Sequence, residues 1–408
     1  MRSTTRDLEP AMPQVAGVAS RLLRPSWVEI DLEAPAENLR AVRRLVGADR
    51  KIFAVLKADA YGFGAREMAD VFVRSGADAL AFADLADAVW MRRQGAALPI
   101  LVFPNALPNA AAEIIAHGLV PTLTSLDEAQ QYAVAARDRP CEVFVKVDAG
   151  LERLGVPAEQ AVTVIAAIAA LPGLRLGGVC THLHASANTA PGYVDWQFAR
   201  FSGVLDGLAA AGVDVPVKLA ASSPLVMQHR DTYLTAVDPG SMLYGVPQTF
   251  AAPPPVPLRP ALRALKACLI QVKDLAPRDR FAAEAPFPVP APMRFGIVPM
   301  GAADGLAGLH VGRALVRGRA VPILAGPSLE HTRVDLTAVP EARVGDEVVL
   351  LGRQGDEEIT PAEVAARHKL SPHGVALAVR ERVARVYVSG GRVVSIRTRL
   401  GTTQVEED

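Results

Sequence analysis

A lysine at the end of a short apolar run is the first residue in this sequence that could do chemistry. The run Ile52–Leu56 predicts a buried strand, and Lys57 follows it directly. Burial favours the neutral form of a lysine amine, which can condense with a carbonyl group. Tyr61 offers a hydroxyl close by, and Gly62 and Gly64 let the backbone approach a ligand. The alternative is an ordinary strand-to-helix turn whose lysine reaches to solvent.

Polar residues also follow other apolar runs of the first half of the chain. They are Lys146 with Asp148, Thr181 with His182 and His184, Ser222 with Ser223, and Asp238. The runs alternate with stretches of helical periodicity, and repeated βα units of this length predict an α/β fold, a parallel (β/α)8 barrel. The carboxyl ends of the strands meet at one face of such a barrel, so we expect these polar side chains to form a site there.

The predicted elements of this half fall into two sets. The strands are Trp27–Asp31, Ile52–Leu56, Ala79–Phe82, Pro99–Phe103, Val120–Leu123, Glu142–Asp148, Leu176–His182, Val217–Ala220 and Ala236–Val237. The helices are Leu32–Val46, Ala65–Arg74, Leu85–Gln94, Asn109–His117, Ser125–Ala136, Ala158–Ala170 and Val194–Ala211.

The rest of the chain changes in character after a proline-rich linker at residues 251–260. Only Pro361–Ala366 has a clear helical pattern, and the other segments predict a C-terminal mainly-β domain over residues 261–408. Its β-like runs are Leu262–Val272, Phe295–Pro299, Leu315–Ile323, Val334–Leu336, Glu347–Gly352, Ala384–Val388 and Val393–Thr398. We expect the barrel to span residues 26–250 and a flexible lead-in to span residues 1–25.

The overall composition narrows the partners and the compartment. Basic and acidic residues both number 43, and this zero net charge argues against nucleic acid or an anionic membrane as a partner. No apolar run approaches the ~20 residues of a membrane span, and the first 25 residues lack the core of a signal peptide. Cys141, Cys180 and Cys268 have no metal-ligand spacing, so we expect reduced thiols of a cytoplasmic protein and no metal.

Several short motifs follow one another along the chain. They are Trp27–Leu32 (WVEIDL), Leu56–Gly62 (LKADAYG), Lys146–Gly155 (KVDAGLERLG), Thr181-His182, Leu243–Gly245 (LYG), Ala303–Gly305 (ADG) and Leu351–Glu357 (LGRQGDE). In this order and spacing the sequence resembles the alanine racemase family of fold-type III pyridoxal-phosphate enzymes. The resemblance implies pyridoxal phosphate as the cofactor, an amino acid as the substrate, and a head-to-tail homodimer with shared active sites.

The resemblance also implies which residues hold the cofactor and its phosphate. Lys57 would bind the cofactor covalently and act as one proton-transfer base. Tyr61 and Ser223 would hydrogen-bond the phosphate, helped by the backbone N–H groups of Gly240 and Ser241. Phosphate is well bound by neutral donors and tight glycine turns, so these roles are physically sensible.

Three further matches concern the substrate side of the cofactor. Arg153 would lie near the phenolic oxygen of the cofactor and bind the substrate carboxylate with its guanidinium fork. Lys146 matches a lysine that is often carbamylated in the family and steadies that arginine. His182 would lie against the pyridine ring. Each residue alone could make a structural hydrogen bond or be a surface charge. Because all of them match the family at the expected positions, together they favour a cofactor site.

The sequence departs from the family where the second base should be. Racemization needs two bases on opposite faces of the substrate carbon, and the family takes a tyrosine for the second from the partner subunit. The place of that tyrosine is Ala283 here, two other tyrosines of the family are replaced by Ala302 and Glu381, and the family's pocket methionine falls on Leu329. The pocket has therefore lost its phenols, which disfavours alanine as the substrate.

Other groups could supply the missing base. The candidates by position are Glu284, His331, Glu381 and His184, each of which could instead be structural. His184 is the best placed within the barrel, two residues after His182, and Glu284 and His331 are candidate substrate contacts.

Asp238 is the second departure, because it matches an arginine that lies at the pyridine nitrogen in the family. The segment Val237–Ser241 resembles the Glu-Pro-Gly segment of the related barrel decarboxylases of basic amino acids. A carboxylate opposite the nitrogen stabilises the protonated ring, which becomes a stronger electron sink. The alternative is that Asp238 only caps the turn before Pro239.

Three functions follow from these residues. The first is an amino-acid racemase or epimerase that uses Lys57 and a replacement second base. The second is a pyridoxal-phosphate lyase or decarboxylase with Lys57 as its sole base and Asp238 at the ring nitrogen. The third is a cofactor-binding protein without activity, against which the retained Lys57, Arg153 and Asp238 argue.

Overall fold

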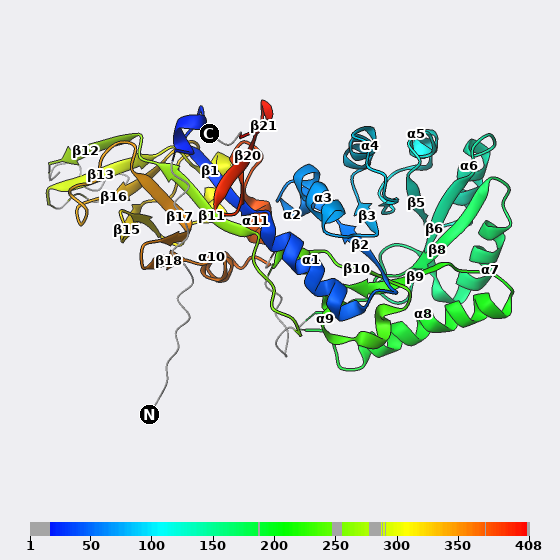
Figure 1. The fold of residues 1–408 in the computed structure, drawn as a ribbon. Coiled ribbons are helices and arrows are strands. Elements are labelled where there is room, and N and C mark those ends of the chain that lie inside the picture. The colour runs from blue at the N-terminus through cyan, green and yellow to red at the C-terminus, as the bar shows by residue number, and fades with distance from the viewer. Residues whose placement is uncertain are drawn as a thin grey trace. The chain divides into compact units, whose positions relative to one another are not determined.

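The computed structural model describes residues 17–186, 188–246, 255–276, 287, 289, 291–371 and 373–405. The chain forms two compact units (Figure 1). A barrel unit lies within Ala34–Pro260, and in a β unit the segment up to Glu33 joins the segment from Ala261 onward. No helix in the described ranges is long and apolar enough to cross a membrane.

The barrel unit is built on a closed ring of parallel strands. In ring order they are β2 (Lys51–Val55), β3 (Ala79–Phe82), β4 (Ile100–Val102), β5 (Val120–Leu123), β6 (Cys141–Asp148), β8 (Leu174–Cys180), β9 (Val217–Ser222) and β10 (Ala236–Asp238). Pairing of β10 with β2 and of β5 with β6 closes the ring, and every pairing in it is parallel. Of the nine strands in this sheet, β7 (Val156–Pro157) pairs only with β6, so eight form the barrel. The predicted (β/α)8 barrel is confirmed.

Helices connect these strands close to the predicted positions. They are α1 (Glu33–Val46), α3 (Ala65–Arg74), α4 (Leu85–Arg93), α5 (Ala111–Ala116), α6 (Leu126–Ala135), α7 (Ala158–Ala169), α8 (Tyr193–Ala210) and the short α9 (Ser223–Gln228). Side-chain caps fix two of the starts, because Asp84 accepts from the N–H of Ala86 before α4 and Ser125 accepts from that of Glu128 before α6.

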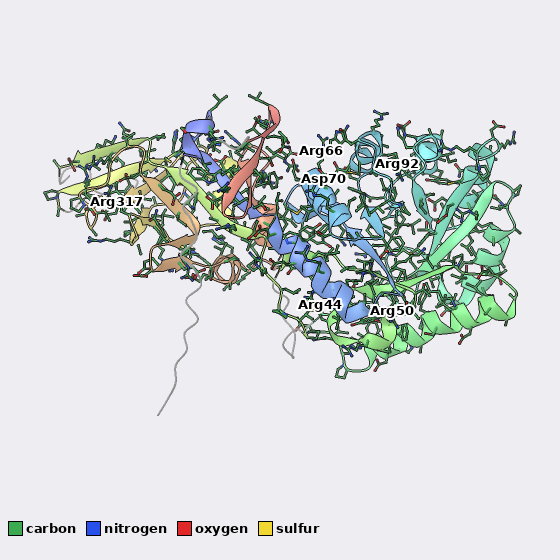
Figure 2. The ribbon with its side chains drawn as sticks, viewed as in Figure 1. Arg44, Arg50, Arg66, Asp70, Arg92 and Arg317 are labelled. Atoms are coloured by element: carbon green, nitrogen blue, oxygen red, sulfur yellow. The ribbon has the colours of Figure 1, made fainter. Side chains whose placement is uncertain are left out.

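Arginines tie neighbouring βα units together at their surface. Arg50 Nε donates to the carbonyl of Leu234 at 3.1 Å, and Arg92 Nε donates to that of His117 at 3.1 Å (Figure 2). Each bond satisfies a backbone carbonyl where a helix or turn ends.

The first predicted strand lies outside the barrel. β1 (Ser26–Asp31) pairs antiparallel with β11 (Leu262–Cys268) and parallel with β19 (Ala384–Ser389). Trp27 packs in a buried cluster with Cys268 and Val386. The predicted barrel start at residue 26 therefore takes in a strand of the other unit, since an alternating pattern does not say which sheet a strand joins.

The end of the predicted flexible lead-in is also packed. Val18 is buried in the same cluster as Trp27. The guanidinium of Arg24 donates twice to the carboxylate of Asp304, both at 2.6 Å. Residues 17–25 are thus part of the β unit, whereas residues 1–16 lie outside the described ranges.

The β unit contains one large sheet and confirms the predicted mainly-β domain. Its order is β12-β13-β16-β15-β14-β17-β11-β1-β19-β20-β21, with β18 paired to β17. The bounds not yet given are β12 (Gln271–Leu275), β13 (Met293–Val298), β14 (Arg313–Val316), β15 (Arg319–Leu324), β16 (Thr332–Asp335), β17 (Glu347–Gln354), β18 (Glu357–Ile359), β20 (Arg392–Thr398) and β21 (Gly401–Gln404).

Two predicted strands of this unit are each divided into two. The run Leu262–Val272 breaks into β11 and β12, and the run Leu315–Ile323 turns back between β14 and β15. At that turn Arg317 and Gly318 have φ of 51° and 76°, which is the conformation that two-residue hairpins require. The predicted helix is α10 (Pro361–His368), and a further helix, α11 (Gly374–Ala378), was not predicted.

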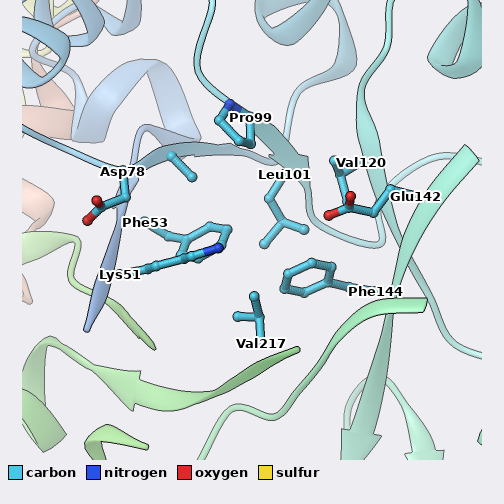
Figure 3. A pocket seen from close by; sticks show the side chains of 10 residues that line it. Lys51, Phe53, Asp78, Pro99, Leu101, Val120, Glu142, Phe144 and Val217 are labelled. Atoms are coloured by element: carbon cyan, nitrogen blue, oxygen red, sulfur yellow. The ribbon is translucent and has the colours of Figure 1, made fainter. Parts of the chain in front are cut away.

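A cavity of about 190 Å³ opens at the amino ends of the barrel strands (Figure 3). Phe53, Leu101 and Phe144 form its apolar lining, and Lys51 and Glu142 also line it. Lys51 begins β2, so this cavity lies at the end of the barrel opposite Lys57. Residues at the amino face of such barrels serve stability, and we assign the cavity to barrel packing.

Candidate active site

Lys57 stands just beyond β2, at the start of an unusual turn. In α2 (Lys57–Tyr61) the residues Ala58, Asp59 and Ala60 have φ of 56°, 51° and 52°, and Tyr61 has 58°. A left-handed backbone costs roughly 1–2 kcal/mol for each residue that is not glycine. Such strain persists only where the surroundings enforce it, and it gathers at functional sites.

The neighbours of this left-handed turn hold it in place. The Asp59 carboxylate accepts the N–H of Ala65 at 2.8 Å, which caps α3, and the Asp59 carbonyl accepts from Gly64 at 2.9 Å. Tyr244 stacks on Phe63 with ring centroids 5.3 Å apart, and its hydroxyl donates to a β2 carbonyl at 2.8 Å. Tyr244 of the LYG motif therefore supports the turn by packing against a residue that follows it and by bonding to the strand that precedes it.

The Lys57 amine lies among charged groups brought together from other strands. Burial lowers the pKa of Lys57 most; Asp238 acts to raise it, and Arg153 and Lys146 act to lower it further. The net pKa is below its ordinary value, which favours the neutral, nucleophilic amine. Its Nζ lies 5.8 Å from the centre of the Tyr61 ring.

Asp238 is a buried carboxyl at the end of β10. Burial raises its pKa to about 6, against the opposing effect of Lys57 and then Lys146. Its Oδ1 atom makes no hydrogen bond within the described part of the chain. A buried carboxylate oxygen without a donor is costly, so this atom fits the N–H of a ligand better than a turn cap.

His182 and His184 follow β8 on the same face of the barrel but differ in surroundings. His182 is held neutral, because burial, and then Lys146 and Lys57, lower its pKa to about 3. His184 is exposed, and its backbone N–H and carbonyl both bond to the buried Gln197 side chain. A neutral imidazole suits packing against an aromatic ring, and an exposed one can exchange protons.

Tyr61, Ser223 and Gly240 converge at the start of α9. Ser223 Oγ accepts from the N–H groups of Gly240 at 2.9 Å and Met242 at 3.2 Å, which aims its own O–H away from them. A Cβ at Gly240 would lie 2.1 Å from the Tyr61 hydroxyl oxygen. Burial, and then Asp238, raise the pKa of Tyr61, so its hydroxyl stays a neutral donor. Ser241 is buried beside them and begins a short 3-10 helix.

Arg153 is presented by a loop that closes on one carboxylate. The Asp148 carboxylate accepts from the N–H groups of Gly150 at 2.9 Å, Glu152 at 3.1 Å and Arg153 at 2.9 Å. Burial acts to raise the pKa of Asp148, but these backbone donors outweigh it and the pKa is lowered. From the sequence we predicted Asp148 at a strand end but not its role as the acceptor that closes this loop. The signal for that role is its position two residues before a glycine, which is typical of a turn.

Two residues were also predicted as substrate contacts, Glu284 and His331. Glu284, like Ala283, lies outside the described residues. His331 is exposed in the β unit, where its carbonyl accepts from the Ser328 N–H at 2.9 Å. The roles of Glu284 and His331 stay predictions.

The ADG motif has a structural role that the sequence did not reveal. Its fully buried Asp304 accepts two bonds from Arg24 and one from the N–H of Gly301 at 2.8 Å. Arg382 Nε lies 3.3 Å from the same carboxylate and its guanidinium pairs with Glu330 at 2.8 Å. The motif thus anchors the segment that precedes β1.

Gly240→Ala is expected to lower the free energy of unfolding by about 1–3 kcal/mol, because the new Cβ would overlap the Tyr61 hydroxyl. Urea denaturation measures the difference. Gly203→Ala is the matched control: Gly203 lies in α8, nothing stands within 4 Å of its added Cβ, and alanine suits a helix better than glycine. Equal stability of the two variants would contradict the close fit of Gly240 and Tyr61.

Comparison with known proteins agrees with both units. The model for the alanine racemase N-terminal domain matches residues 30–248, and that for the alanine racemase C-terminal domain matches residues 262–387. An alanine racemase of Halothermothrix orenii is 31% identical over 376 residues, which are 90% of this chain and 98% of the relative. One of Desulfosudis oleivorans is 35% identical over 379 residues, with 90% and 97% covered.

Solved structures show the same fold. The alanine racemase of Bacillus anthracis with bound L-Ala-P superposes with a TM-score of 0.85 at 27% identity, covering 93% of this chain and 99% of that one. A histidine racemase of Leuconostoc mesenteroides subsp. sake superposes with a TM-score of 0.81 at 27% identity, covering 90% and 99%. The motifs, the two units and these relatives agree, and the chain belongs to the alanine racemase family of amino-acid racemases.

Proposed function

We propose that this chain is a pyridoxal-phosphate-dependent racemase or epimerase of an amino acid other than alanine. The observation that carries the proposal is the meeting of two groups in one site: Lys57, whose pKa is lowered, and the buried Asp238, whose charge acts on Lys57 and whose Oδ1 makes no hydrogen bond among the described residues. The histidine racemase relative supports a substrate other than alanine, since its name gives another amino acid to the same fold.

The residues present fit pyridoxal phosphate. Lys57 would hold it covalently, Tyr61 and Ser223 with the backbone of Gly240 would hold its phosphate through neutral donors, and Asp238 would hold the proton of its ring nitrogen. When bound, the cofactor supplies an electron sink for the pair of electrons that deprotonation leaves at the substrate α-carbon.

The chain's own groups would then move the protons. Lys57 takes or returns the proton at the α-carbon on one face, for which a lowered amine pKa is suited. Arg153 holds the substrate carboxylate, and the neutral His182 packs against the ring. His184, exposed and two residues further on, is the candidate base within the barrel for the opposite face.

A lyase or decarboxylase is the second candidate function, and Asp238 favours it. Those reactions need one base, which Lys57 provides, and they gain from a ring nitrogen kept protonated by a carboxylate. The replacement of the family's tyrosine by Ala283 removes the base that only racemization needs.

The assembly and location belong to the same proposal. A head-to-tail homodimer is supported by membership of a family whose members share residues across subunits. A cytoplasmic location is supported by Cys141, Cys180 and Cys268, which are buried free thiols.

Incubation with L- and D-amino acids in deuterated water tests the function. We expect deuterium at the α-carbon together with the appearance of the opposite enantiomer, and we expect alanine to react more slowly than an amino acid with a larger side chain. Mass spectrometry and chiral chromatography report both quantities. Exchange without inversion, or release of carbon dioxide or ammonia, would identify the lyase; fastest turnover of alanine would overturn the substrate assignment.

A further inference from the structure

Helix α8 holds the loop that presents Arg153. The Tyr193 hydroxyl donates to the carbonyl of Gly150 at 2.6 Å, and Arg200 Nε donates to the carbonyl of Ala149 at 3.1 Å. These two carbonyls begin the loop whose inner side is bound to the Asp148 carboxylate. The loop is therefore held on its inner side by the Asp148 carboxylate and on its outer side by α8.

The same helix holds the segment that carries the two histidines. Gln197 is fully buried, and its Oε1 accepts the N–H of His184 at 2.9 Å. Its Nε2 donates to the carbonyl of His184 at 3.2 Å and to that of Tyr193 at 3.2 Å. With three bonds the amide has one orientation, so the backbone at His184 is fixed relative to Tyr193.

The side chains of α8 fit closely against one another and against the loop. Tyr193 stacks on Trp196 with ring centroids 5.4 Å apart, and the guanidinium carbon of Arg200 lies 4.8 Å from the centre of the Trp196 ring. A Cβ at Gly150 would lie 2.5 Å from Trp196 Cζ3. Only glycine lets the loop come this close, which leaves the Tyr193 hydroxyl at bonding distance.

We propose that Tyr193 is a positioning residue for Arg153. Through Tyr193 and Gln197, helix α8 would fix the backbone that carries Arg153 and the backbone that carries His184, so that both side chains can reach the same substrate. The inference rests on the proposed function, in which Arg153 binds the carboxylate of an α-amino acid. Tyr193 would act by holding the Gly150 carbonyl, three residues before Arg153, and not by touching the substrate or the cofactor.

Tyr193→Phe tests the proposal because it removes the hydroxyl and keeps the ring that stacks on Trp196. With one neutral hydrogen bond lost from the loop, we expect KM for α-hydrogen exchange to rise about 2–10-fold while kcat changes less. The purified holoenzyme should retain its cofactor, since Lys57, Ser223 and Asp238, which would hold it, lie at the ends of β2, β9 and β10 and not on this loop.

Tyr233→Phe is the matched control. The Tyr233 hydroxyl donates to the carbonyl of Val226 at 2.6 Å, the same kind of bond elsewhere in the barrel unit. Its loss should lower thermal stability to a similar degree and leave KM unchanged. An equal KM for Tyr193→Phe and Tyr233→Phe would overturn the proposal.

A double-mutant cycle with Arg153→Lys shows whether Tyr193 acts through Arg153. In the Arg153→Lys background we expect Tyr193→Phe to change KM less than 2-fold, because the group that it positions is already replaced. An undiminished effect there would also overturn the inference. If the wild-type holoenzyme exchanges no α-hydrogen, the proposed function fails and the inference with it; exchange with an unaltered Tyr193→Phe KM rejects the inference alone.

Discussion

Lys57→Ala is expected to reduce α-hydrogen exchange by more than about 10³-fold, because it removes both the covalent anchor of the cofactor and a proton-transfer base. Lys146, the other lysine that acts on this site among the described residues, comes from β6 and not from the left-handed turn, so it does not take the place of the Lys57 amine. Exchange in deuterated water measures the loss, and gel filtration followed by absorbance measures cofactor retention.

Lys51→Ala is the matched control for this prediction. Lys51 begins the strand that leads to Lys57, but it is exposed and lines the cavity at the opposite end of the barrel (Figure 3). We expect it to keep the exchange rate and the cofactor. If Lys57→Ala exchanged α-hydrogens at the wild-type rate, the site would have to be sought elsewhere in the chain.

Much of the barrel could be predicted because its signals are local. Apolar runs and helical periodicity placed strands and helices within a few residues, and α3 has the predicted bounds Ala65–Arg74. The assignment of β1 was wrong because pairing partners far along the chain decide it. The division of Leu315–Ile323 into a hairpin depends on positive φ at Arg317, a residue type that gives no turn signal.

The site shows the same division between residue type and environment. Lys57 and Asp238 were predicted from their types and their places at strand ends. The left-handed backbone of Ala58 and Ala60 could not be, because these residue types do not favour positive φ and only packing against Tyr244 and the bonds of Asp59 enforce it. Tertiary contacts of this kind have no periodic signature.

Asp238→Asn is expected to lower α-hydrogen exchange by about 10²-fold or more, since it removes the charge that would keep the ring nitrogen protonated and so weakens the electron sink. The amide has nearly the same shape, so cofactor retention should change little. Asp238→Glu keeps a carboxylate and should retain more activity than Asp238→Asn. Equal rates for wild type and Asp238→Asn would show that this carboxylate is not part of the chemistry.

The same substitution should stabilise the cofactor-free protein, and the sign follows from the pKa. In the folded protein the Asp238 pKa is about 6, above its ordinary 3.8, so the folded state binds this proton more tightly than the unfolded state does. Stability therefore falls as pH rises from about 4 to about 6, by about 3 kcal/mol for this group, and stays lower above that pH. Asparagine carries no charge and avoids this loss.

Urea denaturation of the cofactor-free protein should thus show Asp238→Asn gaining on the wild type at pH 8, by up to about 3 kcal/mol, and gaining less at pH 5. A stability difference independent of pH would contradict the buried-carboxylate account. A variant that is more stable without cofactor yet far less active with it would mean that the cost of burying Asp238 is retained for catalysis. Lys57 and Lys146 act against the rise in the Asp238 pKa that burial causes, and Asp238 acts against the fall in the Lys57 pKa. Such a result would therefore mean that Lys57 and Asp238 work as one unit and that the reaction depends on both.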